Sequence, residues 1–203
     1  MMTERGLCVD HTAIYRWVQY YSPILEKQCR ARLRTTYDSR RVDETYITQG
    51  YPVKGQWMFL YRAVDSAGAT VEFMLSLARN TQAAKRFFRK ALRSRHTIPP
   101  RMINVDRNPS YPKAVAKLKK GTLPQECSMR PIKYLIGLIE QDHRFIKRRV
   151  SPGMGFWSFD SAWRTLQGYV AMHQLRKGQI QQTTRGDIVS QVRFVAMAFG
   201  LAA

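Results

Sequence analysis

The sequence predicts an α/β protein built around a mixed sheet. Three strand-like segments come first, at about 41–48, 56–64 and 69–77. The turn residues Asp65-Ser66-Ala67-Gly68 separate the last two of them. A helix, an apolar strand, a second helix, a further strand and more helices then follow. Antiparallel strands that lead into alternating helices and strands are expected to share one sheet, with helices packed on its faces.

The middle of the chain has clear local signals. Gln49-Gly50-Tyr51-Pro52 predicts the turn after the first strand. Asn80 or Thr81 can cap the next helix, whose apolar residues recur at helical spacing: Ala84, Phe87, Phe88, Ala91 and Leu92. Pro99-Pro100 ends that segment, and residues 101–106 are expected to form a buried strand.

The remaining elements are expected at 111–120 (helix), 128–134 (strand), 138–147 (helix) and 159–177 (long helix). Three aromatic residues near the start of the long helix, Phe156, Trp157 and Trp163, are expected in the core.

Residues 1–20 resemble the end of a helix-turn-helix. Gly6 suits the turn, and Asp10 can cap the helix that follows. An apolar face forms from Ile14, Trp17 and Val18. The polar residues that point away from this face, and could meet DNA, are His11, Thr12 and Arg16. On spacing alone, an ordinary surface helix explains the pattern equally well.

The charge of the chain indicates a polyanionic partner. Its 203 residues include 34 Lys and Arg against 14 Asp and Glu, a formal net charge of +20. Such a charge repels itself unless nucleic acid or a similar polyanion neutralises it. Residues 21–40 are expected to form a basic linker that contributes to this surface.

Cysteine usage and hydropathy bear on the compartment. The three cysteines are isolated, so a disulfide framework or a zinc site is not expected. No signal peptide is apparent, and the apolar C-terminal run is too short to span a membrane. We therefore expect a cytoplasmic protein without a membrane partner.

Three acidic residues are the best candidates for chemistry. Asp43 lies in a strand, Asp106 ends the apolar run 102–105, and Glu140 lies on a predicted helix. Taken singly, each has a plain explanation as a strand-edge charge, a turn former or a solvated helix residue. Together they match a two-metal site, because Mg²⁺ prefers carboxylate oxygens and a pair of ions can clamp both oxygens of a phosphodiester displacement.

The residues around these acids resemble a known family. Val42-Asp43-Glu44-Thr45-Tyr46, Ile103-Asn104-Val105-Asp106 and Ile139-Glu140-Gln141-Asp142-His143 are similar to segments of bacterial insertion-sequence transposases of the Asp-Asp-Glu class, family six. The 34-residue spacing from Asp106 to Glu140 agrees. Further matching segments are Leu60-Tyr61-Arg62-Ala63-Val64-Asp65, the stretch from Asp10 to Val18, and Leu175-Arg176-Lys177-Gly178-Gln179.

This resemblance implies a ribonuclease-H-like core with Asp43, Asp106 and Glu140 as catalytic and metal-binding residues. The implied cofactor is Mg²⁺ or Mn²⁺, as two ions. The implied reaction is hydrolysis of one strand at each element end, followed by attack of the freed 3′-hydroxyl on target DNA. Residues of the Glu140 helix implied or expected to contact DNA are His143, Arg144 and Lys147. Glu44 points to the other side of its strand and is expected to be structural.

The expected organisation follows from these assignments. Residues 1–20 form a partial helix-turn-helix, 21–40 a linker, 41–180 the catalytic core and 181–203 a tail. Compared with the family, the chain reads as N-terminally shortened. The expected partners are double-stranded DNA and further copies of the chain, as a homodimer or larger synaptic oligomer in the bacterial nucleoid. A catalytically silent DNA-binding remnant is the alternative, and a junction-resolving nuclease is a third reading that shares the acidic site.

Overall fold

The computed structural model describes residues 6, 9–47, 57–131, 137–151 and 156–201. It separates into two compact units. One comprises residues 34–156 and contains the sheet; the other comprises residues 1–33 with 157–203 and is helical. Residues 1–5 of the expected helix-turn-helix, and the turn expected at 49–52, lie outside the described residues.

The sheet has five strands in the order β3-β2-β1-β4-β5. They span Ser39–Tyr46 (β1), Phe59–Asp65 (β2), Thr70–Ser76 (β3), Met102–Val105 (β4) and Ser128–Pro131 (β5). The first three strands pair antiparallel, whereas β4 runs parallel to both β1 and β5. The predicted mixed sheet is confirmed.

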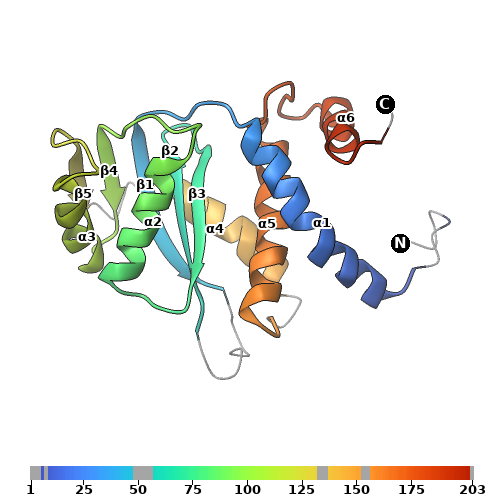
Figure 1. Ribbon diagram of the computed structural model, residues 1–203, viewed down its shortest axis with the longest axis horizontal. Helices are drawn as coiled ribbons and strands as arrows, with labels where there is room; N and C mark the ends of the chain where they lie inside the picture. The colour runs from blue at the N-terminus through green and yellow to red at the C-terminus, as the bar shows by residue number, and fades with distance from the viewer. Residues whose placement is uncertain (1–5, 7–8, 48–56, 132–136, 152–155, 202–203) are drawn as a thin grey trace. The chain divides into compact units, whose positions relative to one another are not determined.

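Helices cover both faces of this sheet (Figure 1). On one face lie α2 (Thr81–Arg93) and α3 (Ser110–Lys119), whose apolar residues share a core with the strands. On the other face lies α4 (Gly137–Val150), where Ile139 packs against Val64 of β2. The expected cap of α2 is present, because the backbone N–H of Ala83 donates to Asn80 Oδ1 at 2.9 Å.

The helical unit contains α1 (His11–Ala31), α5 (Phe159–Arg176) and α6 (Ile188–Ala198). Its core includes Leu25 and Cys29 of α1 together with Leu175 of α5. The two long helices approach closely at Gly168 of α5, where an added Cβ would lie 2.2 Å from Ser22 Oγ. Gly168 therefore permits a helix contact that a larger residue would obstruct.

The N-terminal helix differs from the sequence prediction. A boundary was expected at residue 20, followed by a linker, but α1 continues through Pro23 to Ala31. Interior proline costs a helix about 3 kcal/mol, which burial of Leu25 and Cys29 against α5 offsets. Arg40, also assigned to the linker, is a buried residue of β1. A helix-turn-helix is not confirmed.

Two smaller predictions also meet a clear outcome. Asp10 is the N-cap residue of α1, but its carboxylate bonds the Thr12 hydroxyl and no backbone N–H of the helix. Trp157 was expected in the core and is instead 90% exposed, since it precedes the N-cap Ser158 and lies outside the buried stripe of α5. Within the described residues, no helix is both long and apolar enough to cross a bilayer.

Candidate metal centre and catalytic site

The pairing of β1 with β4 brings Asp43 and Asp106 together. These strands run parallel with Val42 opposite Val105, so the next residue on each strand is an aspartate. Side chains at matching register on adjacent strands share a face of the sheet. Two aspartates that lie 63 positions apart in sequence thus become neighbours.

A third carboxylate, that of Glu44, completes a cluster. One oxygen each from Asp43, Glu44 and Asp106 lies within 4.8 Å of the others. Burial, and then the neighbouring charges of Glu44 and Asp106, raises the pKa of Asp43 to about 7. Burial also raises the pKa of Asp106. Acids that crowd together while partly buried resist ionisation unless a cation joins them.

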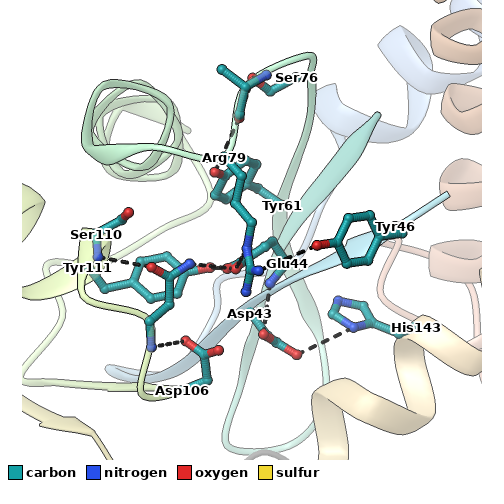
Figure 2. A network of polar contacts seen from close by, with 12 residues as sticks. Asp43, Glu44, Tyr46, Tyr61, Ser76, Arg79, Asp106, Ser110, Tyr111 and His143 are labelled. Carbon is teal, nitrogen blue, oxygen red and sulfur yellow. Dashed lines mark hydrogen bonds and ion pairs between the residues drawn. The ribbon is translucent and has the colours of Figure 1, made fainter. Parts of the chain in front are cut away.

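Glu44 is held by a polar network (Figure 2). Its Oε1 lies 2.6 Å from Arg79 Nε and accepts from Asn108 Nδ2 at 2.6 Å, while its Oε2 accepts from the Tyr111 hydroxyl. The backbone N–H of Asn108 in turn donates to Asp106 Oδ1 at 3.0 Å. Glu44 thereby fixes the segment after β4 that presents Asp106.

This network is what the sequence prediction missed. Glu44 was expected to face away from Asp43, and it does so, because its carboxylate contacts Tyr111 of α3 and Arg79 in the segment before α2. The sequence did not reveal that its carboxylate also reaches the two aspartates. The local signal was Asn108, two residues after Asp106, where a side chain commonly caps a turn.

His143 of α4 lies against Asp43 on the other side. Its Nδ1 is 3.6 Å from Asp43 Oδ2. The side chain is buried, and burial together with the Arg62 charge lowers its pKa to about 3. His143 is therefore neutral at physiological pH and packs beside Asp43. It was expected among the DNA contacts, but burial removes it from the surface because α4 turns this face toward the sheet.

Helix α4 is anchored to the sheet by a buried ion pair. Arg62 lies opposite Asp43 in the β1–β2 register, so both side chains point to the α4 face. Arg62 Nη2 lies 2.5 Å from Asp142 Oδ2, and Nη1 donates to the Asp142 carbonyl at 3.2 Å. The two side chains are 0% and 2% exposed. This pair sits within one turn of Glu140.

Glu140 lies in the first turn of α4 and is exposed. It is not a member of the three-carboxylate cluster formed by the described residues. Its charge nonetheless contributes to the raised pKa of Asp43, so it lies near the site. Of the three acids predicted from sequence, the structure brings two together and places the third on the neighbouring helix.

The other predicted DNA contacts lie on two elements. Arg144 and Lys147 are exposed on α4, on the same unit as the carboxylates. The exposed residues of α1 include His11, Thr12 and Arg16. His11 Nδ1 lies 2.7 Å from Asp10 Oδ1. The exposed cations of α4 thus lie on the unit that carries the carboxylates.

Comparison with known proteins agrees with this site. A family model described as a DDE domain matches residues 37–179. The transposase for insertion sequence-like element IS431mec from Staphylococcus aureus strain Mu50 is 36% identical over 178 residues, which cover 87% of this chain and 75% of that protein. The transposase for insertion sequence element IS257 in transposon Tn4003, also from S. aureus, is 37% identical with the same coverage.

The DDE-domain match over most of the chain and the identity to these two transposases define the chain as a metal-dependent polynucleotidyl transferase. The chain belongs to the DDE transposases of insertion-sequence family six.

Two solved structures share the general arrangement at low similarity. The HTLV-2 integrase catalytic core domain in complex with magnesium matches with a TM-score of 0.45 and 15% identity, over 71% of this chain and 88% of that one. The Mos1 strand transfer complex matches with a TM-score of 0.46 and 12% identity, over 95% of this chain and 60% of that one. At this level they add nothing to the assignment of individual residues.

Proposed function

We propose that this transposase uses Asp43, Asp106 and Glu140 to hold Mg²⁺ or Mn²⁺, as two ions, for strand cleavage and strand transfer at the ends of an insertion sequence. The observation that carries the proposal is the parallel register that puts Asp43 beside Asp106. The family supplies the reaction, the cluster supplies Asp43 and Asp106, and the family resemblance supplies Glu140.

The residues fit a hard divalent cation. Every donor in the cluster is a carboxylate oxygen, which is the ligand type that Mg²⁺ and Mn²⁺ prefer. Burial, and then the charges of Glu44 and Asp106, raise the pKa of Asp43, and a bound cation would favour its ionised form. When bound, the ions would lower the pKa of the attacking hydroxyl and offset charge on the leaving oxygen.

The other residues of the site hold these carboxylates in place. Glu44 positions Asp106 through Asn108, and its own charge is offset by Arg79. His143 packs beside Asp43 as a neutral side chain, so it does not form an ion pair with the Asp43 carboxylate. A fixed arrangement matters because displacement of a reacting group by about 1 Å can cost about a hundredfold in rate.

DNA binding is proposed to rest on exposed cations. Arg144 and Lys147 would contact phosphates near the cleaved bond, while His11, Thr12 and Arg16 of α1 would contact duplex DNA elsewhere. We further propose that two or more copies bring element ends together, and that the protein acts on DNA in the bacterial cytoplasm.

A catalytically silent DNA-binding protein is the second candidate function. The exposure of Glu140 outside the carboxylate cluster is the observation that bears on it, because the third ligand must approach the other two for chemistry. The two functions differ in one measurable respect, which is strand cleavage that depends on both the metal and the acids.

The experiment incubates the full chain with a labelled duplex that carries the element's terminal repeat, in Mg²⁺ or Mn²⁺. We expect nicking that Asp43→Asn, Asp106→Asn and Glu140→Gln each abolish. Glu126→Gln, at an exposed acid of the same unit, is the matched control and should keep full activity. Duplex binding without cleavage in either metal, by the unaltered chain, would select the silent function instead.

A further inference from the structure

Two large aromatic side chains remain half exposed where β1 ends and β2 begins. Tyr46 is the last residue of β1 and is 42% exposed, and Trp57 shortly before β2 is 50% exposed. Their rings lie 5.4 Å apart at 75°, edge to face. Phe59 packs against the Tyr46 ring at 5.1 Å. Tyr46 and Trp57 are here called the aromatic pair.

The aromatic pair is connected to the carboxylate cluster. Tyr46 follows Glu44 by two residues, so both point to the same face of β1, about 7 Å apart. Arg79 bridges them: its Nε lies 2.6 Å from Glu44 Oε1, its Nη1 donates to the Tyr46 hydroxyl at 3.5 Å, and its guanidinium carbon lies 5.9 Å from the Tyr46 ring centroid. Figure 2 shows this line from Asp43 through Glu44 to Tyr46.

This geometry fixes one ring and leaves apolar surface available. Tyr46 is held between Phe59 and Arg79, so ordering it costs little when a ligand arrives. The aromatic pair offers a flat apolar surface beside the Arg79 cation, on a chain with a net charge of +20. Such a surface suits a ligand that carries a flat ring on a polyanionic backbone. A nucleobase has both properties, because every base offers a π-face and its backbone is negatively charged.

We propose that the aromatic pair is a stacking site for an unpaired nucleobase at the DNA end being processed. The proposal rests on the DNA-processing function above. Tyr46 lies three positions after Asp43, an advance of about 10 Å along β1, and the two side chains point to opposite faces of the strand. A stacked strand advances about 3.4 Å per nucleotide. The strand must also pass from one face of β1 to the other, so the captured base lies at least three nucleotides from the phosphate at the carboxylates.

Equilibrium binding in EDTA tests the proposal apart from catalysis. The full chain is titrated with a blunt duplex and with the same duplex carrying an unpaired three-nucleotide end. We expect Trp57→Ala to weaken binding of the unpaired-end DNA about tenfold or more, with less than a twofold change for the blunt duplex. Trp57→Phe keeps a ring and should retain most of the preference.

Trp157→Ala is the matched control, since Trp157 is a highly exposed tryptophan of the other unit. It should leave both affinities unchanged. A 2-aminopurine placed one to five nucleotides from the end should show its largest fluorescence change at the third position or beyond, and Trp57→Ala should remove that change. Thermal melts of all variants should match the unaltered chain, because Trp57 lies outside the buried core.

Three results would overturn the proposal. The first is that Trp57→Ala loses the same affinity for both DNAs, and the second is that it loses no affinity for either. The third is that Trp57→Ala changes the oligomeric state on sedimentation and not the affinity for DNA, which would make the aromatic pair an interface between copies. Absence of metal-dependent cleavage would overturn the proposed function separately, since the binding measurement contains no metal.

Discussion

Breaking the ion pair between Arg62 and Asp142 should destabilise the sheet unit strongly. Both side chains are essentially fully buried, so Asp142→Asn leaves a guanidinium charge in the interior without its counter-charge. Removing one partner of such a pair typically costs about 3–5 kcal/mol. For a chain of this size each kcal/mol lowers the melting temperature by roughly 2–4 °C, so we expect a decrease of about 10 °C.

The assay is thermal and chemical denaturation followed by circular dichroism, with Asp142→Asn, Arg62→Met, Asp142→Leu and the double variant Arg62→Met/Asp142→Leu. Because the double variant leaves no isolated charge, it should be more stable than either single variant, and the cycle should show coupling of a few kcal/mol. Asp38→Asn breaks an exposed pair with Arg101 and is the matched control, with an expected cost below about 1 kcal/mol. Single variants that cost no more than this control would refute the reasoning.

Three further outcomes are expected. First, the raised pKa of Asp43 favours the folded state below about pH 4, and that contribution to stability is lost as the pH rises through about 7. In EDTA at pH 8, Asp43→Asn should therefore be more stable than the unaltered chain by on the order of 3 kcal/mol. This difference in stability should close toward pH 4. Parallel stability curves would contradict this. Second, Gly168→Ala should cost about 1–3 kcal/mol by thermal melt because its Cβ would overlap Ser22, whereas Gly121→Ala has open space and should be neutral; equal melting temperatures would contradict it. Third, Lys147→Gln should reduce the slope of log binding constant against log salt by about one unit, and an unchanged slope would show that this side chain meets no phosphate.

Local sequence was sufficient for most elements of the sheet unit and for the proximity of two of the acids. Asp43 and Asp106 each follow apolar strand residues where an unpaired carboxylate is costly, and this pointed to a shared site. Most strand and helix bounds agree with the prediction to within a few residues. Such agreement is expected where a periodic apolar pattern and a capping residue coincide, as at Asn80.

Long-range pairing was beyond the local pattern. Glu44 depends on Tyr111, which lies 67 positions away, so no window around Glu44 reveals their contact. The burial of the His143 side chain could not be predicted from local sequence either, because it depends on which face of α4 packs against β1 and β2. In α1, the helical spacing of Ser22, Leu25 and Cys29 was the available signal, and the basic residues beside it favoured a linker instead.

The central claim is that Asp43, Asp106 and Glu140 hold divalent cations. Titration of the full chain with Mn²⁺, followed by electron paramagnetic resonance of the free ion, measures this without DNA. We expect two bound ions, loss of binding in Asp43→Asn and Asp106→Asn, weaker binding in Glu140→Gln, and unchanged binding in Glu126→Gln. Mn²⁺ binding that survives both aspartate substitutions at full stoichiometry would contradict the account.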